Sequence, residues 1–324
     1  MILSGHSRLL LGGRGTVPLP RARNLEAPSE EALKLLQGRN RHVYTSLSPG
    51  AIGVRLSFVE SATLARRYGF RGIQIDVGVV EKEGAGKVRD LLDSLGLRAG
   101  SFGLPLAFRE REEAYRESLA KLKARAQAAR QVGCTRSSTY ILSWSETMDF
   151  KENFAFHRDR LRPAAQILAD QGILLGLEFL GPKTLRAGKP YPFIHSIEGM
   201  LELCEAIGTG NVGLLLDAWH WYTSGAGEKE LMALTASQVV DVHVNDAPEG
   251  IPIDEQVDNV RCLPGETGVI DIQGFLGRLK AIGYDGPVTP EPFSARVNAL
   301  PPEEAVKETA EAMKKVWLAA GLAW

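Results

Sequence analysis

The chain has 324 residues, of which 44% are hydrophobic and 24% are charged, and its formal net charge at pH 7 is −1. This is ordinary globular composition with material for a large core. A near-neutral chain without a long basic run argues against nucleic acid as a partner, and no apolar run approaches the roughly 20 residues of a membrane span.

The three cysteines predict a reducing compartment. Cys134, Cys204 and Cys262 are odd in number and widely spaced, so they form neither a disulfide framework nor a CxxC metal site. We therefore expect a cytoplasmic protein without structural disulfides.

Residues 1–41 are predicted to form an N-terminal extension. Glycines and prolines such as Gly12, Gly13 and Pro18 interrupt regular structure there. Residues 29–37 could form one short helix, with Ser29 as its N-cap.

Residues 42–324 are predicted to form a single domain in which strands and amphipathic helices alternate. The strands are expected in the segments HVYTSL, GIQIDVG, LRAGSFG, STYILSW, ILLGLEF, VGLLLD, VVDVHVND and PVTPEPF. The helices are expected over 58–68, 87–95, 109–132, 154–171, 196–207, 228–235, 272–282 and 302–320. Many helices end in a glycine, which can adopt the left-handed conformation that terminates a helix.

These eight strand–helix units predict an α/β fold of the (β/α)8 TIM barrel type. Alternating units place parallel strands inside and helices outside, and eight of them close into a barrel. An open doubly wound sheet is the competing fold. That fold usually carries a glycine-rich phosphate-binding turn, and no GxGxxG follows the first predicted strand.

Four polar residues end four consecutive predicted strands. In a barrel, the carboxyl ends of the strands meet at one mouth, where active sites lie. Three carboxylates and one imidazole suit Mn²⁺, Mg²⁺ or Co²⁺ better than structural Zn²⁺. Any one of these groups could instead be structural, and Asp217 in particular could simply cap the following helix. The four residues are Glu178, Asp217, His243 and Glu291.

The segments GLEF, LLLDAWH, DVHVND and LPGETGVIDIQGFLGRLKAIGYDGPVTPEPF resemble the sugar isomerase/epimerase superfamily with the xylose-isomerase-like barrel. The resemblance covers about 44–321 and is strongest over 175–293. It implies that the four strand-end residues hold one divalent metal ion, for which we expect Mn²⁺, with Mg²⁺ or Co²⁺ as alternatives. It also implies that His220 and Arg261 contact substrate oxygens. The insertion PEGIPIDEQVDN before Arg261 departs from the shorter loop of the epimerases.

The same residues indicate proton transfer next to a carbonyl group. Such a reaction needs a polarised carbonyl, a base that removes the proton and an acid that returns it. Glu178 and Glu291, on the fifth and eighth strands, are predicted to flank the substrate as base and acid, in an order left open. His220 is predicted to hydrogen-bond a substrate hydroxyl, or else to be a core histidine.

Five further residues are predicted to contact substrate, each with a structural alternative. Aromatic rings can stack on a sugar or pack at the barrel rim, a basic loop can bind an anion or be solvated, and an aspartate can bind a hydroxyl or cap a helix. The residues are Trp144, Trp219, Phe102, Lys183 and Asp76.

The leading interpretation is a metal-dependent sugar or keto-sugar isomerase or epimerase that works through a metal-stabilised enediolate. The second is a lyase on the same scaffold, which would dehydrate a keto-inositol or eliminate from a 3-keto-glycoside. The third is an abasic-site endonuclease, which would need more metal ligands and a cationic face. The expected partner is a small carbohydrate, and the terminal helix with Trp317 and Trp324 could pack on a second copy of the chain.

Overall fold

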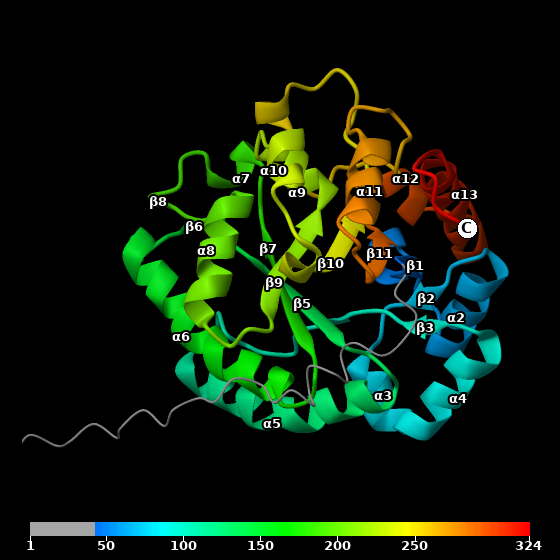
Figure 1. The fold of residues 1–324 in the computed structure, drawn as a ribbon, viewed down its shortest axis with the longest axis horizontal. Helices are drawn as coiled ribbons and strands as arrows, with labels where there is room; N and C mark the ends of the chain where they lie inside the picture. Colours follow the sequence, from blue (N-terminus) through cyan, green and yellow to red (C-terminus); the bar gives the residue numbers. More distant parts are fainter. Residues whose placement is uncertain (1–42) are drawn as a thin grey trace, which may run out of the picture.

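A parallel sheet that closes on itself organises the part of the chain that the computed structural model describes, residues 43–324 (Figure 1). The predicted extension and its helix over 29–37 lie outside the described residues. The sheet contains β1 (Tyr44–Leu47), β2 (Gly72–Ile73), β3 (Arg98–Ala99), β4 (Phe102–Gly103), β5 (Arg136–Ile141), β7 (Leu174–Phe179), β9 (Val212–Asp217), β10 (Val239–Val244) and β11 (Pro287–Pro290). Strands β6 (Trp144–Ser145) and β8 (Tyr191–Pro192) form a separate antiparallel pair.

The barrel closes through β3 and β4, which are two halves of one strand position. β3 pairs with β2, and β4 pairs with β5. Gly100 lies between the two halves, and a Cβ atom added there would come within 2.5 Å of the Ser46 hydroxyl. Only glycine therefore lets the chain pass so close to β1. Counted this way, the nine strands occupy eight barrel positions, and the predicted TIM barrel is confirmed.

Helices surround the sheet (Figure 1). The longer ones are α2 (Phe58–Arg67), α3 (Val77–Glu83), α4 (Ala85–Leu95), α5 (Glu112–Gln131), α6 (Phe150–Ala169), α8 (Ile197–Ile207), α11 (Ile272–Ala281) and α13 (Pro302–Ala319). Shorter ones are α7 (Lys183–Arg186), α9 (Ala218–Thr223), α10 (Glu228–Met232) and α12 (Ala295–Asn298), with 3₁₀ turns η1 (Gly50–Ile52), η2 (Ala236–Gln238) and η3 (Ile253–Glu255). None of the helices in this described part combines the length and the apolar character that crossing a bilayer requires.

The first residues of three helices bear on where these helices depart from the predicted bounds. α6 begins at Phe150 rather than at 154, because Asp149 and Glu152 form a capping box. α5 begins at Glu112 rather than at 109, with two glutamates in its first turn, where the helix dipole favours negative charge. α3 was not predicted, because its valines and glycine are poor helix formers, and Asp76 caps it.

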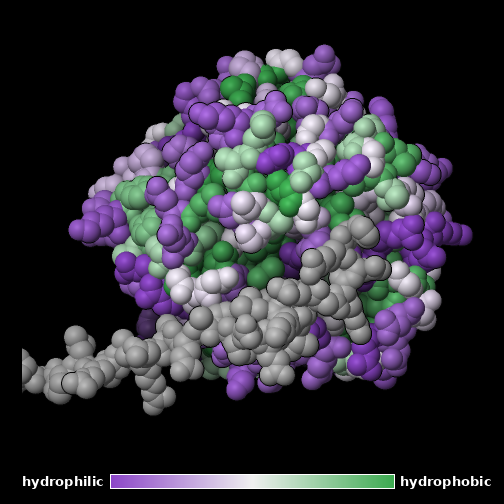
Figure 2. Space-filling model, viewed as in Figure 1, coloured by the Kyte–Doolittle hydropathy of each residue, from purple (hydrophilic) through white to green (hydrophobic). Residues whose placement is uncertain are grey.

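Apolar side chains fill the space inside the sheet and between the sheet and the helices. The largest fully buried side chains include Trp219, Phe102 and Phe179, which come from three different strand ends. Figure 2 shows hydrophilic residues around most of the outline of one face, with hydrophobic residues nearer its middle.

Candidate active site

The four strand-end residues come together at the mouth of the barrel. Each of Glu178, Asp217, His243 and Glu291 offers one ligand atom, and these atoms lie within 4.8 Å of one another. The residues end β7, β9 and β10 and follow β11, which are neighbours in the sheet in the order β11-β10-β9-β7. Apolar side chains inside each strand bury the strand, so that the polar residue at its end is held in a fixed place.

Two atoms of this cluster lack partners although they are buried. Glu178 Oε1 and His243 Nδ1 have no hydrogen-bond partner. His243 Nδ1 lies 3.2 Å from Glu291 Oε2, which is an ion-pair distance without the geometry of a directed hydrogen bond. Buried polar atoms are normally satisfied, and a divalent cation would satisfy both. The donor set therefore fits a metal ion.

Burial and mutual repulsion control protonation in the cluster. Burial raises the pKa of Glu178 well above its usual 4.5, and the nearby carboxylates Asp217 and Glu291 raise it further. Burial alone would lower the pKa of His243, but Glu291 outweighs it and the pKa rises to about 10. Without a cation, His243 thus holds a proton at neutral pH that a bound cation would displace, and the raised pKa of Glu178 favours its protonated form.

Asp217 is held by contacts on both of its oxygens. Oδ1 accepts from the Trp219 backbone N–H at 2.7 Å, which caps α9, and from the Asn245 side chain at 2.9 Å. Oδ2 accepts from Arg261 at 2.8 Å. Burial opposes ionisation, but Arg261 and the two histidines outweigh it and lower the pKa of Asp217 to about 2. Asp217 is therefore a fixed anion that both caps a helix and faces the cluster.

The Arg261 guanidinium lies inside the cluster. Besides Asp217, it contacts Glu291 Oε2 at 3.2 Å and Asp258 Oδ1 at 2.9 Å. Its side chain is only 2% exposed, and it lies over the Phe293 ring with 4.9 Å to the centroid. The cluster thus contains one permanent cation of the protein's own, so fewer negative charges remain uncompensated than the sequence alone indicated.

His220 presents one hydrogen-bond donor to the cluster. Its Nδ1 accepts from the Gly181 backbone N–H at 3.2 Å, which leaves the proton of the neutral ring on Nε2. Nε2 lies 3.9 Å from Glu178 Oε1 and 3.3 Å from Arg261, which is itself a donor and cannot accept. Burial lowers the pKa of His220 to about 4, so the ring is neutral at physiological pH. It can donate to an oxygen bound between these residues.

The structure places the other predicted contacts at three locations. Trp219 lies under Arg261 and is fully buried, and Phe102 is fully buried in the core. Trp144 on β6 is half-buried, with the Lys189 ammonium 3.7 Å from its ring centroid. Asp76 caps α3 on the side of β2, away from the four-residue cluster. A substrate role for each of these residues stays a prediction.

Lys183 pairs with the neighbouring long loop. Its ammonium lies 2.5 Å from the Asp254 carboxylate, and the adjacent Thr184 hydroxyl donates to the Gln256 carbonyl at 2.8 Å. Both ends of the ion pair are more than half exposed, so the pair adds little stability. The contacts join the loop after β7 to the insertion before Arg261. An anion-binding role for Lys183 stays a prediction.

Two residues that hold the site together are not among those predicted from the sequence. Asn245 supports Asp217, and Asp258 supports Arg261. Asn245 follows His243 by two positions, and since side chains alternate along a strand, that spacing could have placed both residues on one side. Asp258 lies in the insertion, where no sequence pattern predicts its contact with Arg261.

The sequence relatives include an isomerase and a dehydratase. An inosose isomerase from Bacillus velezensis is 27% identical over 205 residues, which is 63% of this chain and 70% of that protein. A 3-dehydroshikimate dehydratase from Pseudomonas aeruginosa is 27% identical over 265 residues, which is 81% of this chain but 39% of that longer protein.

Solved structures share the barrel. A xylose isomerase domain protein from Alicyclobacillus acidocaldarius superposes with a TM-score of 0.76 at 30% identity, covering 86% of this chain and 99% of that one. The IOLI protein, solved with a zinc atom, superposes with a TM-score of 0.70 at 21% identity, covering 84% of this chain and 97% of that one. The second likeness shows the fold alone.

A family model described as the xylose isomerase-like TIM barrel matches residues 62–316, from α2 into α13. The match covers well over half of the chain and confirms the resemblance inferred from the strand-end segments. The chain belongs to the xylose isomerase-like TIM barrel family.

Proposed function

We propose that the protein is a divalent-metal-dependent isomerase or epimerase of a sugar or keto sugar, which moves a proton on the carbon next to a carbonyl through an enediolate. The observation that carries the proposal is the position of Glu178 and Glu291. They lie at the ends of β7 and β11, with β9 and β10 between them, so they are the two outer members of the four-residue cluster. The enzymes among the relatives, an isomerase and a dehydratase, support catalysis of this kind.

The two glutamates are suited to exchanging a proton. The pKa of Glu178 is raised by burial, which makes its carboxylate, once formed, a stronger base than an exposed glutamate. Glu291 contacts Arg261 and His243, which hold its carboxylate in place. One residue would remove the proton and the other would return it to the same or the adjacent carbon. The order of the two roles is left open.

Two fixed donors face the place where negative charge develops on the substrate. Arg261 is a buried cation and His220 is a neutral Nε2–H donor, and both are positioned before substrate binds. Preorganised donors in a buried site stabilise a developing oxyanion more than they do in water. These residues would orient the substrate's carbonyl and hydroxyl oxygens toward the glutamates.

The cluster would hold the metal ion through Glu178, Asp217, His243 and Glu291. When bound, a divalent cation polarises the carbonyl and stabilises the enediolate. An oxygen-rich set with one imidazole favours Mn²⁺, Mg²⁺ or Co²⁺, and we propose Mn²⁺. Zinc is the alternative, because the IOLI structure was solved with a zinc atom.

A lyase is the second candidate. The 3-dehydroshikimate dehydratase matches more of this chain than the inosose isomerase does, 81% against 63%. Dehydration begins with the same proton removal and differs only in that a leaving group departs before the proton returns. An abasic-site endonuclease is disfavoured, since in the described part of the chain one cluster of four such ligands is found, and this activity would need more.

Mass spectrometry of a substrate panel in D₂O tests the proposal. The panel contains free ketoses, ketose phosphates, keto-inositols and 3-keto-glycosides, each with purified protein and Mn²⁺. Uptake of solvent deuterium with an otherwise unchanged formula is the expected result. Loss of water or of an aglycone would identify a lyase instead. Absence of deuterium uptake from every substrate, with bound metal verified, would overturn the shared enediolate chemistry.

A further inference from the structure

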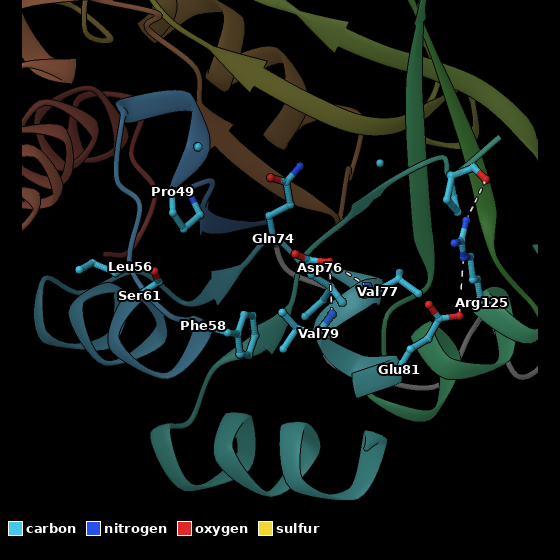
Figure 3. A pocket seen from close by; sticks show the side chains of 15 residues that line it. Pro49, Leu56, Phe58, Ser61, Gln74, Asp76, Val77, Val79, Glu81 and Arg125 are labelled. Atoms are coloured by element: carbon cyan, nitrogen blue, oxygen red, sulfur yellow. Dashed lines mark hydrogen bonds and ion pairs between the residues drawn. The ribbon is translucent and has the colours of Figure 1, made fainter. Parts of the chain in front are cut away.

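A cavity of about 620 Å³ opens at the carboxyl ends of β1, β2 and β4, at the mouth of the barrel (Figure 3). Its lining contains none of the four cluster residues and neither Arg261 nor His220. Its volume falls within the range of roughly 300–1,000 Å³ that is typical of small-molecule sites. The mechanism described above leaves this space unused.

Strand register connects the cavity to the cluster. β1 pairs with β11, with Thr45 opposite Val288, so the segment that leaves β1 at Ser48 is the neighbour of the segment that leaves β11 at Glu291. The Ser48 hydroxyl in turn donates to Gln74 Oε1 at 2.7 Å, and Gln74 lines the cavity. The cavity therefore lies at the same mouth of the barrel as the predicted catalytic Glu291, on the side of the strand next to β11.

The polar groups of the lining suit hydroxyls. Gln74 uses its amide oxygen on Ser48, while no described residue accepts a hydrogen bond from its amide nitrogen. Asp76 uses Oδ1 to cap α3, where it accepts from Gly78 and Val79, and Oδ2 has no such partner in the described chain. One donor group and one acceptor group are thus available side by side, as Figure 3 shows.

The charges of the lining disfavour an anion. Glu81 lies 3.6 Å from Arg125, whose guanidinium also reaches the Pro105 carbonyl. Glu81 thereby compensates the charge of Arg125, and the Asp76 carboxylate gives the lining a net negative charge. A phosphate or carboxylate would meet net negative charge here. Leu56 and Phe58 provide apolar surface against which the C–H face of a sugar ring can pack.

We propose that this cavity binds a neutral, hydroxylated ring that is part of the substrate but remote from the reacting carbon. The substrate class is then a two-part molecule, a keto sugar linked to a second uncharged ring, rather than a free or phosphorylated ketose. The inference rests on the proposed function for the identity of the first part. The cavity itself is defined by residues that this function does not use.

A substitution that fills the cavity tests the proposal. Gly103 lines the cavity from β4, and a Cβ atom added there meets no atom within 4 Å, so Gly103→Leu places a side chain in the space without a backbone clash. Gly86→Leu on α4 is the matched control, because Gly86 also has open space around it but lies outside the cavity. Circular dichroism verifies that both variants fold.

Binding is measured on the full-length Mg²⁺-loaded protein by saturation-transfer NMR, with cellobiose as the neutral two-ring probe and glucose 6-phosphate as the anionic probe. We expect cellobiose to bind the parent protein and Gly86→Leu equally, and Gly103→Leu about tenfold more weakly. Glucose 6-phosphate should not compete. Equal cellobiose binding by Gly103→Leu, stronger binding of glucose 6-phosphate, or no cellobiose binding would each overturn the proposal.

Deuterium exchange with the substrate panel, measured on the same proteins, separates this inference from the proposed function. Exchange without cellobiose binding would overturn the two-part substrate and leave the proposed function standing. Cellobiose binding that Gly103→Leu weakens, without exchange on any substrate, would overturn the proposed function and leave the cavity as a sugar site.

Discussion

Arg261 Nη1 lies 2.8 Å from Asp217 Oδ2, in a pair whose side chains are 2% and 0% exposed, inside the cluster that is suited to a metal ion. The guanidinium partly neutralises the carboxylates before any cation binds. A buried pair of this kind is costly to break, because the remaining charge is left unpaired.

Replacing the guanidinium should therefore strengthen the effect of metal on stability. We expect Arg261→Met to destabilise the metal-free protein by about 3–5 kcal/mol. The Tm of the variant should rise more on addition of Mn²⁺ than the Tm of the parent does, because a site with one cation fewer binds Mn²⁺ more tightly. Thermal melts with and without Mn²⁺ measure both effects. Arg296→Met, which removes an exposed ion pair with Glu308, is the control, and an equal gain in Tm for Arg261→Met and the parent would contradict the prediction.

The glutamate on β7 should be needed for proton exchange. Glu178→Gln keeps the size of the side chain and one oxygen but cannot take a proton, so we expect deuterium exchange to fall about 10²- to 10⁴-fold. Glu249→Gln, at an exposed position of the insertion, should exchange as the parent does. Bound metal is determined on each protein by elemental analysis. Unchanged exchange in a Glu178→Gln protein that retains metal would assign the base to another residue.

The four cluster residues could be predicted because each follows a strongly apolar strand and because parallel strands end at one edge. The role of Asp217 shows what such patterns omit. From the sequence, capping the next helix and facing the cluster are alternative roles for Asp217. A carboxylate has two oxygens, however, and Asp217 uses Oδ1 for the cap and Oδ2 for Arg261.

Contacts made by irregular segments could not be predicted from periodicity. Arg261 follows a long insertion, and its bonds to Asp217 and Asp258 depend on how that insertion folds back over the barrel. The cavity beside Gln74 is likewise formed by three separate strand–helix loops. Loop conformation and side-chain packing, rather than strand order, determine both features.

Metal binding should release protons. With its pKa raised to about 10, His243 holds a proton at pH 7 in the metal-free protein. This ligand must lose its proton to bind a cation, so affinity rises as pH increases. Calorimetry of Mn²⁺ binding at pH 7 in buffers of different ionisation enthalpy should show release of at least about one proton. Binding enthalpies that do not depend on the buffer would show that His243 is already deprotonated.

His157 should make the fold sensitive to acid. Its ring is buried against Phe193, with centroids 5.3 Å apart, and its Nε2 has no partner. Burial lowers the pKa of His157 from 6.5 to about 4. His157 therefore binds a proton below about pH 6.5 in the unfolded chain but only below about pH 4 in the folded chain. The free energy of unfolding thus falls as pH decreases from about 6.5 to about 4. The full effect corresponds to roughly 3 kcal/mol.

We expect His157→Phe to lose less stability than the parent between pH 7 and pH 4, because phenylalanine fills the aromatic site without a group to protonate. Urea unfolding at several pH values measures the difference, and titration of the other groups cancels between the two proteins. Phe150→Leu, at a half-exposed position on the same helix, should change stability equally at every pH. Parallel profiles of unfolding free energy against pH for His157→Phe and the parent would show that protonation of His157 does not drive acid unfolding. His220, whose pKa is also lowered to about 4, would then be the next residue to replace.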